Sequence, residues 1–282
     1  MLTYIVLICH CEARLAILPI TTEEFECFRR LIYDHAGISL VPEKKVMVSS
    51  RLAKRLDYYG LSRYGDYYQL VVGRDHPDEF QVMVNILTTN ETYFFREPKH
   101  FEFFRDEILQ PWRGDSFRVW SAASSTGEEA YSLAMVLSEN LRSRNWEIFA
   151  SDLSTQVLDV ARNGIYTMDR LDHMDPRFLE KYCLKGVRAQ TGLFRVDKTL
   201  RSRVTFAQVN LMSPLPVNLG RFDVIFLRNV LIYFDQDTKK QVVERLATAL
   251  KPGGYFFVSH SESLHRVTDQ LRMLKPSIYR KI

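Results

Sequence analysis

Residues 119–135 read VWSAASSTGEEAYSLAM, in which an apolar run, a loop of small residues and a stretch with helical spacing follow one another. The pattern predicts a strand over residues 117–123, a tight turn at Gly127 and a helix over residues 128–138. Gly127 would let the backbone approach a ligand closely, and Asp152 ends the next apolar run. This order is typical of a wound α/β sheet, which binds ligands over the carboxyl ends of its strands.

Short apolar runs alternate with amphipathic stretches along the rest of the chain after Thr88. Further strands are predicted over residues 147–152, 204–210, 222–228 and 255–260, and a second crossover helix over residues 238–250. Glycines at 186 and 192 punctuate residues 184–198, which favours a hairpin-like insertion there. The predicted fold class is therefore α/β, with a wound, Rossmann-like sheet that carries a small β insertion.

Residues 21–87 show helical patterns without a strand signal, which predicts a small all-α domain. Thr21 and Glu24 have capping-box spacing at the start of a helix that ends near Gly37, and further helices are expected over residues 46–59, 63–72 and 77–87. The expected division of the chain is a tail at 1–20, the helical domain at 21–87, a linker with site residues at 88–115 and the α/β domain at 116–282. For the tail, disorder and a different start site are both open.

The composition is that of an ordinary soluble protein: 282 residues, 46% hydrophobic, with a formal net charge of +4. Concentrated basic runs, which usually mark nucleic-acid binding, are missing from the sequence. The four cysteines (Cys9, Cys11, Cys27 and Cys183) are too few and too scattered for a disulfide framework or a zinc site, although Cys9 and Cys11 flank His10. The apolar residues 4–8 are far shorter than the roughly 20 residues of a membrane span. We expect a cytoplasmic protein with reduced thiols and no metal.

The loop around Gly127 also limits the kind of cofactor. It is not a GxGxxG motif, and a single glycine is poorly suited to holding a pyrophosphate, so a cofactor without phosphates fits better. S-adenosylmethionine is the common cofactor of that kind. An alternative stays open, because Ser125 with Glu128 and Thr126 with Glu129 also have capping-box spacing. Asp152, followed by Ser154, could likewise belong only to the turn that starts a helix.

Two further stretches combine polar and aromatic residues. Residues 222–234, FDVIFLRNVLIYF, place Arg228 and Asn229 at the carboxyl end of a predicted strand, where a wound sheet binds its ligand. Tyr233 follows them, and the alternative to a site role for this residue is a ring that covers the core. Residues 90–101, NETYFFREPKHF, place Arg96 among aromatic residues, where its planar guanidinium could bind a carboxylate. The alternative for Arg96 is an interdomain salt bridge.

Together these motifs resemble the CheR family of chemotaxis receptor methyltransferases. The resemblance covers about residues 21–282 and depends on TNETYFFR, WSAASSTGEEAYS, ASDLS with the downstream NGIY, VNL, RNVLIYF and LKPGG in the family's order and spacing. It implies a class I methyltransferase that uses S-adenosylmethionine to methylate receptor glutamate side chains, which produces glutamyl methyl esters and S-adenosylhomocysteine. One departure is Ser124, where many members have Cys.

The resemblance also implies roles for individual residues. Arg96 and Tyr233 would stand nearest the transferred methyl group and the substrate carboxylate. The residues expected to line the cofactor pocket are Asn90, Thr92, Arg96, Glu128, Asp152, Asn210, Leu211, Arg228 and Asn229. The insertion, at about residues 184–203, resembles the family's β-subdomain, which in some members binds a C-terminal pentapeptide of the receptor.

The helix predicted over residues 46–59 sorts its charges to one side, with Lys44, Arg51, Lys54 and Arg55 along one flank of an apolar face. Such a flank is usually solvated surface. In the CheR family this domain is implicated in docking the acidic methylation helices of the receptor, which makes Arg51, Lys54 and Arg55 docking candidates. The expected partner is therefore a receptor's cytoplasmic segment, with no nucleic acid and no insertion into the membrane.

A glutamate carboxylate has an unperturbed pKa of about 4.3, so it is ionised at neutral pH and can attack a methyl group without a general base. Two rival functions stay open: a nucleic-acid methyltransferase and a non-catalytic sensor that binds S-adenosylmethionine. Against the first, the chain lacks the [DN]PP[YF] motif that is typical of methylation of base amino groups. Against the second, Arg96 and Tyr233 are both present.

Overall fold

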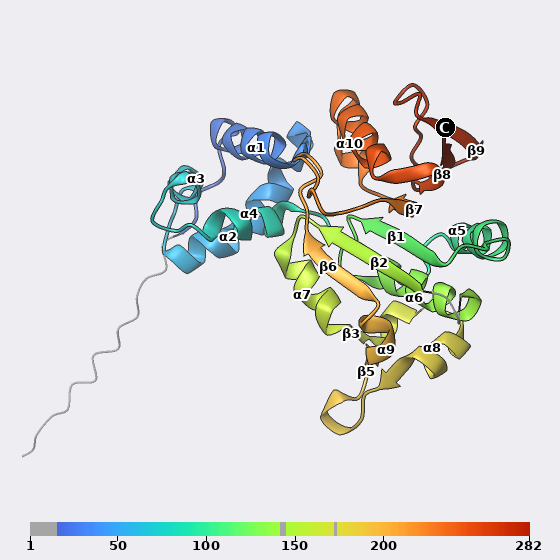
Figure 1. Ribbon diagram of the computed structural model, residues 1–282. Helices are drawn as coiled ribbons and strands as arrows, with labels where there is room; N and C mark the ends of the chain where they lie inside the picture. Colours follow the sequence, from blue (N-terminus) through green and yellow to red (C-terminus); the bar gives the residue numbers. More distant parts are fainter. Residues whose placement is uncertain (1–15, 142–144, 172–173) are drawn as a thin grey trace, which may run out of the picture. The chain divides into compact units, whose positions relative to one another are not determined.

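The computed structural model describes residues 16–141, 145–171 and 174–282 in two compact units (Figure 1). Residues 1–15, which include Cys9 and Cys11 and most of the expected tail, lie outside the described residues. The first unit holds the described chain up to Leu31 together with residues 41–87. The second unit holds Ile32–Leu40 and Thr88–Ile282. Among the described residues, no helix has both the length and the apolar character needed to cross a membrane.

The first unit is helical, as the sequence predicts. Its elements are α1 (Thr22–Ala36, which continues into the second unit), η1 (Pro42–Lys44), α2 (Lys45–Tyr59), α3 (Tyr64–Val72) and α4 (Glu79–Leu87). The capping box is confirmed, because the Thr21 amide donates to Glu24 Oε2 at 2.8 Å and the Glu24 amide donates to Thr21 Oγ1 at 3.1 Å. Val48, Leu52 and Leu56 of α2 are fully buried. The predicted apolar face of this helix is therefore its core-facing side.

The second unit is built on a sheet with strand order β6-β2-β1-β7-β8-β10-β9. Its strands are β1 (Ser116–Ala122), β2 (Asn145–Asp152), β6 (Val204–Gln208), β7 (Phe222–Leu227), β8 (Leu250–Phe257), β9 (Leu271–Lys275) and β10 (Ile278–Lys281). The first five in that spatial order run parallel, and β10 and β9 are antiparallel to their neighbours. The predicted wound α/β sheet is thus confirmed, with a seven-stranded sheet.

Helices surround this sheet, and a smaller sheet is inserted between β2 and β6 (Figure 1). The helical elements are α5 (Pro98–Phe103), the π-helix η2 (Phe104–Leu109), α6 (Glu128–Asn140), α7 (Thr155–Asn163), η3 (Met168–Leu171), α8 (Pro176–Tyr182), η4 (Arg188–Gln190), α9 (Lys198–Arg201), η5 (Leu231–Tyr233) and α10 (Gln236–Thr248). The smaller sheet has the order β3-β5-β4, with β3 (Ile165–Thr167), β4 (Cys183–Lys185) and β5 (Leu193–Val196).

Two apolar clusters lie on opposite faces of the main sheet, because successive strand residues point to opposite sides. Val119 and Phe226 pack in the cluster that includes η2 and α6, whereas Trp120 and Leu227 pack in the cluster that includes α10. Burial on both faces explains why these strands read as continuous apolar runs in the sequence. It also leaves the carboxyl ends of the parallel strands as the edge where polar side chains can gather.

The predicted strands are all present with boundaries shifted by a few residues, and the hairpin-like insertion is confirmed by the antiparallel pair β4 and β5. Three strands were not predicted: β3, which joins the insertion from upstream, and the antiparallel strands β10 and β9 at one end of the main sheet. β9 has only five residues, LRMLK, of which Leu271 alone is buried, so it is too short for apolar alternation to identify it in the sequence.

Candidate active site

The loop after β1 is held by the carboxylate that ends β2. Because β1 and β2 are parallel neighbours, their carboxyl ends meet, with Ala122 opposite Ser151. Asp152 Oδ2 accepts the Ser125 amide proton at 2.8 Å, and Oδ1 accepts that of Ser154 at 2.9 Å. The turn that starts α7 is therefore present, as one reading of Asp152 expected. The same carboxylate also fixes the loop of small residues.

Asp152 is nearly fully buried, and burial raises its pKa although backbone amides hold its ionised form. A carboxylate has about four acceptor positions, so the backbone bonds leave room for the hydroxyls of a ribose. Two serine hydroxyls nearby, Ser124 Oγ and Ser154 Oγ, are buried without a hydrogen-bond partner in the part of the chain that the structure describes. Unpartnered buried polar atoms beside a buried carboxylate fit a site that a polar group completes.

Glu128 and Glu129 form no capping box with Ser125 or Thr126. The N-cap residue is Gly127, in the left-handed region at φ 95°, so the two glutamates are the first two residues of α6 and not at the third position that a capping box requires. The capping-box alternative is therefore wrong. Glu128 accepts from Thr126 Oγ1 at 2.6 Å and lies 3.4 Å from Arg170 Nη1, and burial raises its pKa. Glu129 accepts from Ser121 Oγ at 2.7 Å and forms an ion pair with Arg228.

Residues 90–97 run beside the loop after β1. The Asn90 carbonyl accepts the Ser125 hydroxyl proton at 2.8 Å, and the Thr92 carbonyl accepts from Arg170 Nη1 at 2.7 Å. The Arg96 guanidinium donates to the Glu91 carbonyl at 2.9 Å and lies over the ring of Tyr93. The linker thus brings Arg96 and the loop of small residues into one set of hydrogen-bonded segments within the second unit.

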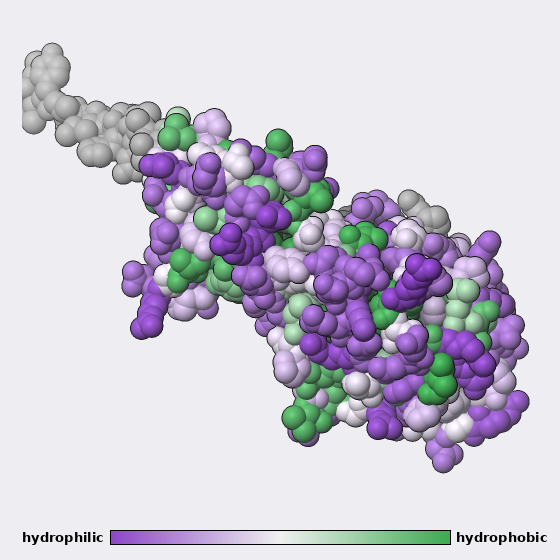
Figure 2. Space-filling model, turned by 90° about the horizontal axis from the view of Figure 1, so that it is seen from above, coloured by the Kyte–Doolittle hydropathy of each residue, from purple (hydrophilic) through white to green (hydrophobic). Residues whose placement is uncertain are grey.

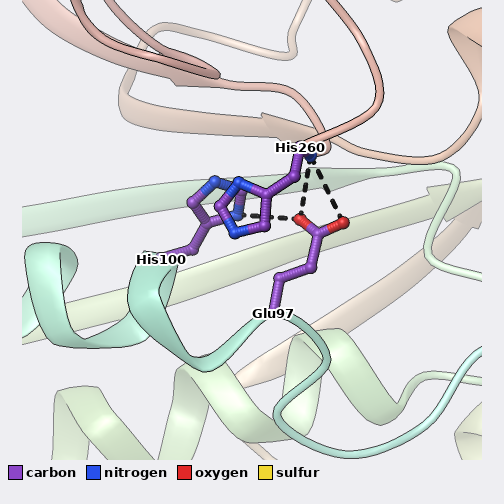
Figure 3. Close-up of side chains that lie close together, drawn as sticks. All are labelled: Glu97, His100 and His260. Carbon is purple, nitrogen blue, oxygen red and sulfur yellow. Dashed lines mark hydrogen bonds and ion pairs between the residues drawn. The ribbon is translucent and has the colours of Figure 1, made fainter.

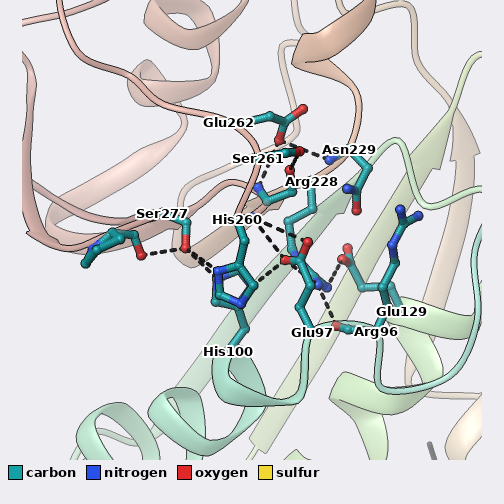
Figure 4. A network of polar contacts seen from close by, with 12 residues as sticks. Arg96, Glu97, His100, Glu129, Arg228, Asn229, His260, Ser261, Glu262 and Ser277 are labelled. Carbon is teal, nitrogen blue, oxygen red and sulfur yellow. Dashed lines mark hydrogen bonds and ion pairs between the residues drawn. The ribbon is translucent and has the colours of Figure 1, made fainter.

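Arg228, at the end of β7, is enclosed by protein. Its side chain is 2% exposed, and it donates to Glu129, to the Arg96 carbonyl and to Glu97 (Figure 4). Asn229 follows with φ 59°, and its amide donates to Glu262 Oε2 at 3.0 Å. The guanidinium of Arg228 therefore acts inside the protein, where it links the residues beside the site.

The remaining candidates have other partners. Asn210 Nδ2 donates to the His35 carbonyl at 2.6 Å, and Asn210 Oδ1 accepts the Met212 amide proton at 2.9 Å. Leu211 is buried, and its carbonyl accepts from Arg245. Tyr233 is half-buried against the apolar cluster of α10, as its alternative reading expected. Among the hydrogen bonds of the described residues, none joins Tyr233, Asn210 or Leu211 directly to Arg96.

Sequence reasoning missed several residues of this network, above all Glu97, Glu129, Arg170, His100 and His260. Glu97 directly follows Arg96, and Glu129 was considered only as a helix cap. Their roles depend on partners that are far away in the chain, such as the 131 positions that separate Glu97 from Arg228. A periodicity or a short motif carries no signal for such pairs.

One cluster has the residue types of a metal site. The ligand atoms of Glu97, His100 and His260 lie within 4.8 Å of one another (Figure 3). However, Glu97 already pairs with Arg228 at 2.9 Å, and His100 Nε2 lies 2.7 Å from the Ser277 hydroxyl. A buried guanidinium on the carboxylate disfavours a second cation there, so we assign no metal to this cluster.

In the first unit, the basic flank of α2 divides into two kinds of residue. Arg55 makes a bidentate pair with the buried Glu79, at 2.7 and 2.6 Å, and Arg51 Nη1 donates to the Leu87 carbonyl at 3.0 Å. Tyr59 and Tyr67 also donate to Glu79, and these donors lower its pKa although burial acts to raise it. Lys54, in contrast, is exposed. Arg51 and Arg55 thus have contacts inside their own unit.

Comparison with known proteins gives a consistent result. Residues 90–280 match the family model described as CheR methyltransferase, SAM binding domain, and residues 23–88 match CheR methyltransferase, all-alpha domain. The chemotaxis protein methyltransferase of Escherichia coli is 40% identical over 93% of this chain and 92% of its own length. Chemotaxis protein methyltransferase 2 of Pseudomonas aeruginosa is 40% identical over 92% of this chain and 93% of its own.

Proposed function

Because the chain belongs to the CheR family of methyltransferases, we propose that it transfers the methyl group of S-adenosylmethionine to glutamate side chains of chemotaxis receptors. The observation that carries the proposal is the set of segments at the carboxyl edge of the sheet. There the loop held by Asp152 lies beside the linker that bears Arg96. The alternatives, a nucleic-acid methyltransferase and a sensor, have no comparable observation in their favour.

The cofactor supplies an electrophilic methyl group on a positively charged sulfur. In the proposal, Asp152 accepts hydrogen bonds from the ribose, and the loop backbone around Gly127 lies close to the nucleoside. Glu128, buried beside Thr126, offers a carboxylate oxygen to a cationic part of the cofactor. Asn90, Thr92, Asn210, Leu211 and Asn229 complete the pocket mainly through the positions of their backbone segments, since several of their polar groups hold the surrounding turns.

The acceptor glutamate needs no general base because its carboxylate is ionised at neutral pH. One of its oxygens bonds to the methyl carbon while the bond from that carbon to sulfur breaks, and the electron pair stays on sulfur. Arg96 orients the carboxylate and the Tyr233 hydroxyl helps to hold the reactants in line. Such alignment can contribute roughly 7 to 11 kcal/mol in favourable cases.

Receptor recognition is proposed for two exposed surfaces. In the first unit, Lys44 at the end of η1 and Lys54 on α2 are exposed and suit an acidic methylation helix, whereas Arg51 and Arg55 would contribute mainly by keeping α2 in place. In the smaller sheet, β4 is an edge strand, so a receptor's C-terminal peptide could add to it as a further strand. Leu184 and Val187, 61% and 71% exposed, would contact such a peptide.

The function is tested by incubating the chain with methyl-labelled S-adenosylmethionine and a receptor cytoplasmic fragment. We expect label on fragments that carry Glu at the modification sites and none on fragments with Ala there. Mild alkali should release the label as methanol, because a glutamyl methyl ester hydrolyses whereas a methylated base does not. Label that resists alkali, or that is equal on the Ala fragments, would exclude glutamate esterification.

A further inference from the structure

Arg96 lies between two residues with unusual backbone conformations. Phe95 has φ 55° and Glu97 has φ 59°, in the left-handed region that non-glycine residues rarely adopt. Such conformations persist only where the surrounding contacts hold them. Phe95 is held by its amide, which donates to Ser132 Oγ at 2.9 Å, and by its ring, which stacks on Phe178. On the other side of Arg96, the contacts come from Glu97.

The Glu97 carboxylate is the centre of these contacts. Its Oε2 lies 2.9 Å from Arg228 Nη2 and 3.2 Å from His100 Nδ1, and both oxygens are 3.3 Å from the His260 amide (Figure 4). The contact with His100 is at ion-pair distance, although its angle is poor for a hydrogen bond. These groups belong to segments that follow β7, start α5 and follow β8. One side chain therefore joins three segments at the edge of the sheet.

Arg228 connects the Glu97 carboxylate to the backbone of Arg96 through hydrogen bonds. The same Nη2 that contacts Glu97 donates to the Arg96 carbonyl at 2.5 Å, while Nη1 donates to Glu129 of α6 at 2.8 Å. A buried guanidinium with two carboxylates has little freedom to move, because each displacement would leave a buried charge without its partner. The carbonyl of Arg96 is thus fixed by an arginine whose own position depends on Glu97.

The outer side of the network limits the movement of Glu97. His100 is buried, and its Nε2 lies 2.7 Å from Ser277 Oγ, which is also 3.2 Å from His260 Nδ1. The two imidazole rings lie 4.4 Å apart between their centroids. Ser277 directly precedes β10. The antiparallel end of the sheet therefore holds His100, which in turn contacts Glu97.

We propose that Glu97 is a positioning residue for methyl transfer, which acts by holding the backbone of Arg96 through Arg228. The inference depends on the proposed role of Arg96 at the reacting groups. Glu97 would bind neither cofactor nor receptor. A shorter side chain would leave Arg228 without this partner and release the conformation of residues 95–97, whereas a neutral side chain of the same shape would keep weaker contacts with Arg228.

The test is a double-mutant cycle of Arg96→Ala and Glu97→Ala, with kcat, receptor KM and S-adenosylhomocysteine affinity measured for each protein. We expect Glu97→Ala to lower kcat by ~10²-fold with receptor KM nearly unchanged, since misplacement of a reacting group costs about that much. In the Arg96→Ala background, the further loss of kcat should be under about threefold, because residues that act as one unit are not additive. Glu97→Gln, which keeps the shape and accepting oxygen, should recover at least about tenfold.

Glu147→Ala is the matched control. Glu147 lies in the same unit, near the amino end of β2, and pairs with Arg118 at 2.5 Å. A loss of kcat in Glu147→Ala equal to that in Glu97→Ala, or full additivity in the cycle, would overturn the proposal. If Glu97→Ala does not fold, the cycle is run with Glu97→Gln under the same criteria.

A different result would contradict the proposed function. If the wild-type chain binds S-adenosylhomocysteine but esterifies no receptor glutamate, the chain is not a glutamate methyltransferase. The cycle would then be measured on S-adenosylhomocysteine affinity, which Glu97→Ala should weaken only indirectly, by displacing Arg96. That weakening should disappear in the Arg96→Ala background; a weakening that persists there, or none at all, would overturn the proposal.

Discussion

At the scale of single residues, polar side chains at the sheet edge have structural partners as well as proposed ligands. Asp152 holds two backbone amides, and Arg228 holds a carbonyl and two carboxylates. The sequence identified both positions because a polar residue at the end of an apolar strand stands out. It did not reveal which of their atoms are already bonded, since those partners come from other segments.

Replacement of Asp152 by alanine should weaken binding of S-adenosylhomocysteine by roughly 10- to 100-fold, the worth of a hydrogen bond to a charged group. The loop should also loosen, because the Ser125 and Ser154 amides lose their acceptor. Calorimetry on the folded variant measures the affinity. Asp159→Ala, which removes an exposed carboxylate from α7, serves as the control. Equal affinity in Asp152→Ala and the wild type would exclude Asp152 from the cofactor site.

The lowered pKa of the Glu97 carboxyl predicts that the stability of the protein depends on pH. Burial acts to raise its pKa, but the contacts with His100 and Arg228 outweigh burial and lower it from 4.5 to about 2. As the pH falls from 4.5 to about 2, the unfolded state takes up a proton that the folded state does not, so stability falls. At pH values above 4.5, the ionised Glu97 carboxylate contributes on the order of 3 kcal/mol to the free energy of unfolding.

Denaturant unfolding of the wild type and of Glu97→Gln across this window measures the effect. We expect the difference in unfolding free energy between the two proteins to be largest above pH 4.5 and to shrink towards pH 2. A difference that stays constant with pH would mean that the contacts of Glu97 do not stabilise its ionised form.

At the scale of elements, α2 shows what a helical projection can and cannot reveal. The projection placed Arg51, Lys54 and Arg55 on one flank, and the structure separates them by their partners. Arg55 forms an ion pair with Glu79, whose side chain is 3% exposed, whereas Lys54 is exposed. Periodicity identifies the face of a helix, but the neighbouring helix decides whether a charge on that face is paired.

Arg55→Ala should therefore lower the unfolding free energy by about 3 to 5 kcal/mol, because it leaves the Glu79 carboxylate buried without its cation. Lys54→Ala should change it by less than about 0.5 kcal/mol. Chemical denaturation followed by circular dichroism compares the two variants. Equal stabilities of Arg55→Ala and Lys54→Ala would show that the buried pair contributes little, and would return Arg55 to the docking candidates.

At the scale of the whole molecule, the two units contribute different surfaces to the proposed reaction. The second unit carries the candidate active site, and the first exposes Lys44 at the end of η1 and Lys54 on α2. The face in Figure 2 is largely hydrophilic, with hydrophobic residues in small groups. A hydrophilic face suits a transient encounter, and an exposed lysine such as Lys54 would attract an acidic partner electrostatically and accelerate that encounter.

Lys54→Glu should raise the receptor KM by about threefold or more at low salt, since an exposed ion pair contributes up to about 1 kcal/mol. Binding of S-adenosylhomocysteine should be unchanged. Lys240→Glu makes the same charge change at an exposed lysine of α10 and is the control. An equal rise of KM in both variants would assign the effect to net charge, and no rise in Lys54→Glu would leave this lysine as solvated surface.

The wound α/β sheet, the helical unit before it and the motifs at the strand ends were all predicted from the amino-acid sequence alone. These features are local, because hydrophobic periodicity and small-residue loops reflect interactions between residues close together in the chain. The partners of Glu97, Arg228 and Glu79, and strands β3, β9 and β10, became visible only in the three-dimensional structure. Those pairings join residues that are distant in the sequence, and burial of a charge becomes favourable only where folding brings its opposite charge beside it.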